Sequence, residues 1–162
     1  MRAKLDVTYL RKLIKFALCP LDIWSENAEE ILLMIAAHES GLGVELLQLP
    51  HGPAVGLYGM EPRTDRDIWN NYLKYRTPIK DRVTGMTGAK WSDPESLRFN
   101  PVYSTIMARL KLLMRPGKLP GDIEEMGAYA KENYNTWKGR ATAERYVLDY
   151  RRFVLRRHLV KG

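Results

Sequence analysis

Residues 25–41 read SENAEEILLMIAAHESG, and this stretch predicts a single helix with a buried face. Ser25 is a suitable N-cap, and the glutamates that follow it lie at the positive end of the helix dipole. Glu39 comes four residues after Ile35 and eight after Ile31, so its carboxylate should continue the buried row. That row is built from apolar residues at helical spacing as far as Gly41: Ala28, Ile31, Leu32, Ile35 and Ala36.

The position of Glu39 favours a proton-transfer role. The carboxylate lies in the last turn, where the negative end of the helix dipole and burial both stabilise its protonated form. A carboxyl group that holds its proton near neutral pH is suited to general acid catalysis. Taken alone, the same residue is more often a helix-end carboxylate that caps neighbouring backbone or pairs with an arginine.

The remaining pattern is mostly helical and shows no internal repeat, so we expect one domain over residues 1–162. Five glycines and three prolines fall between Gly41 and Arg63, which predicts a loop or a small hairpin after the second helix. An irregular loop is expected from Thr84 to Ser96. Helices are predicted from Asp6 to before Pro20, from Thr64 to before Pro78, from Asn100 to before Arg115, from Asp122 to Asn133, and from Thr142 to near Leu159.

Several motifs then follow one another in a recognisable order. Glu39-Ser40-Gly41 ends a helix, and Gly56-Leu57-Tyr58, Pro62 and Thr64 follow after a loop. Later segments are Asn100-Pro101-Val102-Tyr103, Ala128-Tyr129 and Tyr134-Asn135. Over roughly residues 25 to 150 the chain resembles the soluble lytic transglycosylase and goose-type lysozyme group of the lysozyme-like superfamily, in its phage-encoded branch.

The resemblance implies a lysozyme-like helical fold and cleavage of peptidoglycan between N-acetylmuramic acid and N-acetylglucosamine. Glu39 would be the general acid and base, and no cofactor or metal would take part. A hydrolase would also need a second acid, for which the candidates are Glu61, Glu45 and Asp65. The substrate-binding positions that it implies are Ser40, Gly56, Leu57, Tyr58, Met60, Tyr134 and Asn135. Position 59 departs from the pattern, because this chain has Gly59 where the family has a glutamine that lines the sugar site.

Composition and charge limit the possible functions but do not select one. The chain has 162 residues, of which 45% are apolar and 28% charged, and its net charge of +7 suits an anionic partner. We expect no signal peptide and no membrane span, since the longest strongly apolar run, residues 31–37, is too short. The single cysteine, Cys19, excludes an internal disulfide.

The leading hypothesis is a peptidoglycan-cleaving enzyme of a phage, located in the virion or in the host cytoplasm and acting on periplasmic peptidoglycan. Its partners would be glycan strands and other virion proteins. The alternatives are a catalytically inactive lysozyme-like virion protein, which Gly59 favours, and a basic helical nucleic-acid-binding domain. The second alternative draws on the arginines of the last helix, but no nucleic-acid-binding module accompanies them: Arg145, Arg151, Arg152, Arg156 and Arg157.

Overall fold

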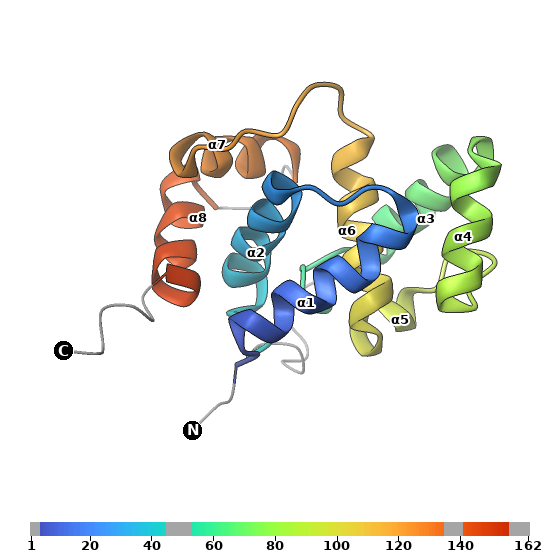
Figure 1. Ribbon diagram of the computed structural model, residues 1–162, viewed down its shortest axis with the longest axis horizontal. Helices are drawn as coiled ribbons and strands as arrows, with labels where there is room; N and C mark the ends of the chain where they lie inside the picture. The colour runs from blue at the N-terminus through green and yellow to red at the C-terminus, as the bar shows by residue number, and fades with distance from the viewer. Residues whose placement is uncertain (1–3, 45–52, 135–140, 156–162) are drawn as a thin grey trace.

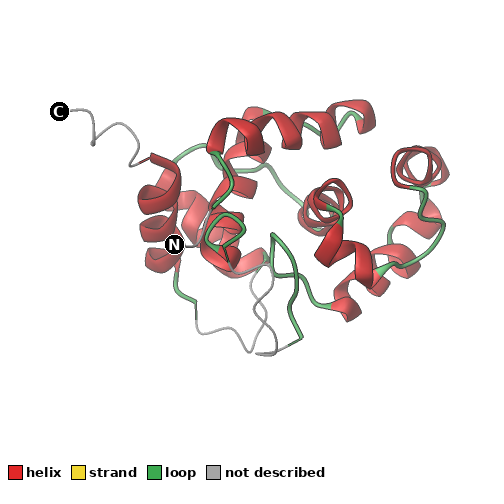
Figure 2. Cartoon of the chain, turned by 90° about the horizontal axis from the view of Figure 1, so that it is seen from below, coloured by secondary structure: helices red, strands yellow, loops and turns green. Residues whose placement is uncertain are grey.

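The computed structural model describes residues 4–44, 53–134 and 141–155, and over these residues the protein is mainly α-helical (Figure 1). This confirms the prediction that the fold is mainly helical. No strand is present in the described part of the chain (Figure 2). The helices are α1 Val7–Leu18, α2 Glu26–Ser40, α3 Pro62–Asn71, α4 Thr77–Thr87, α5 Pro94–Phe99, α6 Pro101–Leu113, α7 Ile123–Asn133 and α8 Ala143–Tyr150.

Helix α2 is the centre of the molecule. Residues 31–37 are each at most 1% exposed, and α2 packs against α1, α6, α7 and α8. A helix that is apolar on all sides is stable only where other helices enclose it. Helices α7 and α8 lie on one side of α2, and α3, α4 and α5 lie on the far side of α6 (Figure 1). The packing of these four helices therefore fixes the position of the C-terminal turn of α2, which carries Glu39.

The predicted ends of the first two helices are confirmed. The Asp6 carboxylate accepts hydrogen bonds from the backbone N–H groups of Thr8 and Tyr9 and so caps α1. Ser25 accepts one from Ala28 N and caps α2. Helix α2 ends at Gly41, which adopts a left-handed φ of 57°.

The region between residues 62 and 99 differs from the prediction. Pro78 does not stop a helix; it lies in the first turn of α4, which runs to Thr87. The expected irregular loop from Thr84 to Ser96 thus includes the end of α4 and the start of α5. The error has a physical reason, because proline lacks the N–H that a first turn leaves free and therefore starts helices as readily as it ends them.

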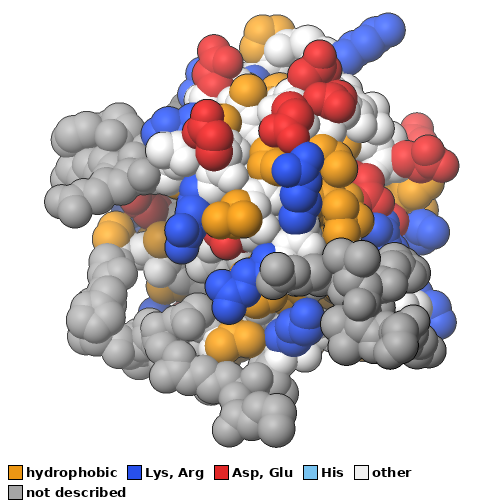
Figure 3. Space-filling model, turned by 90° about the vertical axis from the view of Figure 1, so that its left-hand side faces the viewer, with side chains coloured by type: hydrophobic (Ala, Val, Ile, Leu, Met, Phe, Trp, Pro, Cys, Tyr) orange, Lys and Arg blue, Asp and Glu red, His pale blue; other side chains and the backbone are white. Residues whose placement is uncertain are grey.

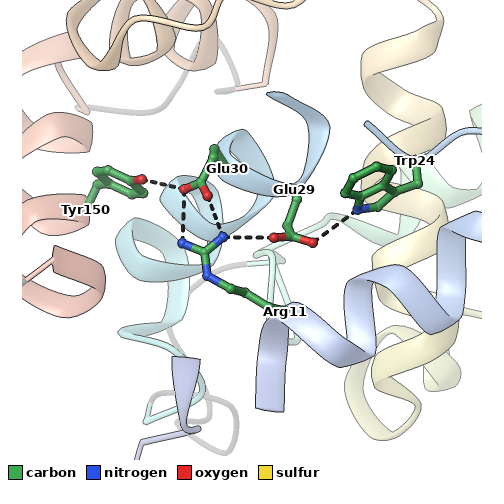
Figure 4. Close-up of polar contacts among 5 residues, drawn as sticks. All are labelled: Arg11, Trp24, Glu29, Glu30 and Tyr150. Atoms are coloured by element: carbon green, nitrogen blue, oxygen red, sulfur yellow. Dashed lines mark hydrogen bonds and ion pairs between the residues drawn. The ribbon is translucent and has the colours of Figure 1, made fainter. Parts of the chain in front are cut away.

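A polar network fastens α2 to its neighbours (Figure 4). The guanidinium of Arg11 on α1 pairs with Glu30 and, through Nη1 at 2.8 Å, with Glu29 Oε2. Trp24 Nε1 donates to Glu29 at 3.1 Å, and the Tyr150 hydroxyl on α8 donates to Glu30 at 2.5 Å. Three helices are tied together by charge-assisted bonds at the half of α2 that is remote from Glu39.

The face formed by α7 and α8 carries both signs of charge (Figure 3). Arg151, at the start of a π-helical turn Arg151–Leu155 that follows α8, pairs with Glu124 of α7 at 2.6 Å. The basic character expected of the last helix is thus partly neutralised in the described residues, and Arg156 and Arg157 lie outside them. No helix within the described ranges is both long and apolar enough to span a bilayer.

Candidate active site

Glu39 lies in the last turn of α2 and is half-buried. Tyr146 of α8 donates a hydrogen bond from its hydroxyl to Glu39 Oε1 at 3.1 Å. Burial raises the pKa of Glu39 above its ordinary value, while His38, the Tyr146 hydroxyl and Lys111 act in the opposite direction. The side chain is therefore held in one place and is biased toward its protonated form, as the sequence predicts for a general acid.

A tight turn covers the Glu39 carboxylate. Val55 and Met60 form an antiparallel bridge through two backbone hydrogen bonds of 2.9 and 3.0 Å. This bridge closes the small hairpin that the glycine-rich segment predicts. Gly59 within the turn has a φ of +55°, and a β-carbon there would lie only 2.5 Å from Glu39 Oε2. Glycine is the residue that lets the backbone adopt this conformation and approach the carboxylate so closely.

Ser40 joins this turn to the helix. Its side chain is 1% exposed, and its hydroxyl donates to Leu57 O at 2.7 Å or to Ala36 O at 3.1 Å. The same oxygen accepts a hydrogen bond from Gly43 N at 3.0 Å. Ser40 therefore positions the turn against α2, and in this conformation its hydroxyl faces the backbone and not a ligand.

The other implied substrate-binding side chains are also buried. Leu57, Tyr58, Met60 and Tyr134 are each at most 2% exposed. The Tyr58 hydroxyl lies 2.8 Å from Thr105 Oγ1, and the Tyr134 hydroxyl donates to Tyr58 O at 2.7 Å. These rings present no exposed face on which a sugar could stack. Instead, the Tyr134 hydroxyl holds the backbone of the turn at Tyr58. Gly56 is also buried, and Leu97 O lies too close to it to leave room for a β-carbon. Asn135 lies outside the described residues.

Of the candidate second acids, Asp65 has partners away from Glu39, Glu61 pairs with Arg63 and also acts on Lys111, and Glu45 is not described. Asp65 is 0% exposed and accepts hydrogen bonds from the Tyr103 hydroxyl at 2.7 Å, from Asp93 N at 3.0 Å and from Ser92. Burial raises the pKa of Asp65. Glu61 is 8% exposed and pairs with Arg63 Nε at 2.5 Å. Glu45 lies outside the described residues. Neither described carboxylate is hydrogen-bonded to Glu39 or to Tyr146.

Sequence reasoning missed two residues of the site. Tyr146 is part of the apolar stripe of α8, and nothing in the stripe distinguishes it from a packing residue. Lys111 of α6 donates to Tyr134 O at 2.5 Å and lies 4.1 Å above the Tyr134 ring. Burial lowers the pKa of Lys111 to about 8, against the opposing effects of Glu39 and Glu61. The site thus pairs an acid whose pKa is raised with a lysine whose pKa is lowered.

His38 lies beside the acid and is held by its own partner. Its Nδ1 is 2.8 Å from Asp149 Oδ2, and its ring centroid is 4.1 Å from that of Tyr146. These contacts give His38 a packing and hydrogen-bonding role. The His38 ring therefore packs against the Tyr146 ring and helps to fix its position.

Comparison with protein-family models, with curated proteins and with solved structures found no match to this chain. The resemblance to lytic transglycosylases therefore depends on the motif residues themselves. Within the described ranges, no group of three or more His, Cys, Asp or Glu side chains is arranged to hold a metal ion.

The hydrogen bond from Tyr146 gives a prediction that does not require substrate. Replacing Tyr146 with phenylalanine removes a donor that stabilises the ionised carboxylate, so the pKa of Glu39 should move further upward. Carbon-13 NMR of the Glu39 side-chain carboxyl, followed through a pH titration, measures this directly. Tyr150→Phe is the matched control, because Tyr150 bonds to Glu30 on the same helix pair. An unchanged Glu39 titration in Tyr146→Phe would mean that the bond contributes nothing to the state of the acid.

Proposed function

We propose that the protein is a peptidoglycan-cleaving enzyme in which Glu39 is the only catalytic carboxylate. The observation that carries the proposal is the enclosure of Glu39 at the end of a buried helix, with a fixed donor on one oxygen and a glycine against the other. A structural carboxylate at a helix end needs no such close approach by a second backbone segment. The motif order described above supplies the substrate class.

The reaction can be written with this one acid. Protonated Glu39 donates its proton to the glycosidic oxygen while the bond from that oxygen to C1 of N-acetylmuramic acid breaks. The carboxylate that results takes the proton of the C6 hydroxyl of the same sugar, and the C6 oxygen bonds to C1. The products are a 1,6-anhydromuramic end and a free N-acetylglucosamine hydroxyl, and Glu39 recovers its proton.

The surroundings of Glu39 suit both halves of this cycle. Burial favours the acid that the first step needs, and the Tyr146 hydroxyl and the Lys111 cation favour the carboxylate that the second step needs. Engagement of Asp65 with Tyr103 supports the transglycosylase over the hydrolase, which requires a second placed acid. Glu61 is the candidate nearer to the site, because it acts on Lys111 together with Glu39.

The inactive virion protein is the weaker alternative once Gly59 is understood. Its support was the missing glutamine, yet at position 59 a side chain of any kind would meet the Glu39 carboxylate. Gly59 is thus compatible with an active site in which the turn backbone, and not a glutamine side chain, lies against the catalytic carboxylate. Delivery by a virion, or passage through a membrane lesion made by another protein, would bring the enzyme to its substrate.

The products of digestion test the proposed reaction. Purified protein incubated with isolated sacculi should release muropeptides whose muramic ends are mainly in the 1,6-anhydro form. Mass spectrometry distinguishes them from reducing ends, which are heavier by one water. Predominantly reducing ends would instead indicate a hydrolase, and separate Glu45→Ala, Glu61→Ala and Asp65→Ala variants would then identify the second acid.

A further inference from the structure

A pocket of about 320 Å³ lies at the opposite end of α2 from Glu39. It is enclosed by the start of α2, the last turn of α6 and the segment that connects α6 to α7. Asn27, which lines it, precedes Glu39 by twelve residues, or about 18 Å along a helix axis. The pocket is therefore separate from the candidate active site, and a ligand bound there would not contact Glu39. Its lining includes Asn27, Arg109, Arg115, Lys118, Leu119 and Tyr129.

Arg109 of α6 differs from the other cations of the pocket because it is mostly buried. It is 9% exposed, and its Nε donates to Ile23 O at 2.9 Å. Its two terminal amino groups donate no hydrogen bond to any residue of the described ranges, and no carboxylate there pairs with it. These amino groups are not sealed in the interior, because no side-chain nitrogen of the described residues is both fully buried and unpartnered. Burial lowers the pKa of Arg109, opposed only by the nearby hydroxyls of Tyr129 and Tyr72.

Arg11 shows how this protein treats a partly buried arginine elsewhere. Its guanidinium meets two glutamates, and those glutamates have further partners of their own (Figure 4). A guanidinium that is mostly buried and forms no ion pair loses part of its hydration, and an anion that binds to its accessible amino groups offsets that loss. The contrast with Arg11 indicates that the partner of Arg109 is not supplied by the described chain.

The rim of the pocket has the same sign of charge. Arg115 and Lys118 are exposed and form no ion pair with the described residues, and no aspartate or glutamate lines the pocket. Three cations around one small cavity match a doubly charged anion better than a single carboxylate.

We propose that this pocket binds a phosphate group, either free or on a small phosphate monoester. The planar guanidiniums of Arg109 and Arg115 can each present two donors to phosphate oxygens, and Lys118 adds a third charge. Leu119 and the Tyr129 ring provide apolar surface for the organic part of a monoester. The volume is in the range of small-ligand sites and exceeds what a bare phosphate needs.

Calorimetric titration of the full-length protein with inorganic phosphate and with phenyl phosphate tests the proposal. Saturable binding with a Kd below about 1 mM is expected for at least one probe. Phenyl phosphate binding more tightly identifies a monoester as the ligand class, and inorganic phosphate binding equally well or better identifies the free ion. Benzyl alcohol, which keeps the ring without the charge, should not bind. Absence of saturable binding by both phosphates, or equal binding of benzyl alcohol, would overturn the proposal.

Variants locate the binding in this pocket. The double variant Arg115→Ser/Lys118→Ser changes only exposed side chains and should weaken binding by at least about tenfold. Lys12→Ser/Arg66→Ser removes the same charge from exposed positions elsewhere and should leave the Kd within about twofold. Arg109→Leu should abolish binding. If Arg109→Leu fails to fold, the double variant still decides, because equal affinity in the two double variants would contradict the assignment.

Discussion

Replacement of Glu39 by glutamine is expected to lower the rate of glycan cleavage by at least about 100-fold, which is the usual contribution of a general acid. Glutamine keeps the size of the side chain and can still accept the Tyr146 hydrogen bond, but it has no proton to transfer. The rate at which soluble fragments leave dye-labelled sacculi measures the effect. Glu26→Gln makes the same chemical change at an exposed position on the same helix and should leave the rate unchanged.

The same substitution should not weaken the fold. Burial raises the pKa of Glu39, so the folded protein binds this proton more tightly than the unfolded chain does. The stability that this site contributes is complete at low pH and decreases as the pH rises through the folded-state pKa. Glutamine stays neutral, so Glu39→Gln should melt at the same temperature as wild type or higher at neutral pH. A large fall in melting temperature would show that Glu39 is a structural carboxylate.

Introducing the family's glutamine at position 59 is expected to damage the protein. In Gly59→Gln the β-carbon would lie 2.5 Å from Glu39 Oε2 and 3.0 Å from Glu39 Cβ, and the backbone has a φ of +55°. The left-handed conformation should cost about 1–2 kcal/mol of unfolding free energy. Displacement of the carboxylate from the Tyr146 hydroxyl should also lower the rate of cleavage by at least about tenfold.

Denaturant unfolding and the sacculus assay measure the two effects of Gly59→Gln. Gly85→Ala is the matched control, since Gly85 lies inside α4 with no atom within 4 Å of a β-carbon. That change should stabilise the protein slightly, by up to about 1 kcal/mol. A Gly59→Gln variant that cleaves glycan faster than wild type would mean that the turn can accommodate the family's arrangement.

Local sequence signals predicted the helices whose ends are fixed by their own residues. Asp6, Ser25 and Gly41 each form the cap that their side chain or flexibility suggests. The helices around Pro78 and Pro94 were not predicted, because a proline gives the same local signal whether a helix starts or ends beside it. Only tertiary packing distinguishes the two outcomes.

Only part of the candidate site could be predicted, because its residues come from helices that are far apart in the sequence. Glu39 and the glycine-rich turn are close in sequence, and helical spacing was enough to place the carboxylate on the buried row. Tyr146 reaches Glu39 from 107 residues away, through the packing of α8 on α2. Lys111 comes from α6, where it follows a run of buried residues. Periodicity describes one helix at a time and cannot predict which residues of different helices meet.

The most direct test of the account is the amount of soluble anhydromuramyl fragment that equal concentrations of wild type and Glu39→Gln release from purified sacculi. Mass spectrometry of the soluble fraction, against a sample without protein, gives this amount. We expect abundant fragments with wild type and none above the background with Glu39→Gln. Equal release by the two proteins, or no release by a folded wild type, would contradict the claim that Glu39 transfers the proton in glycan cleavage.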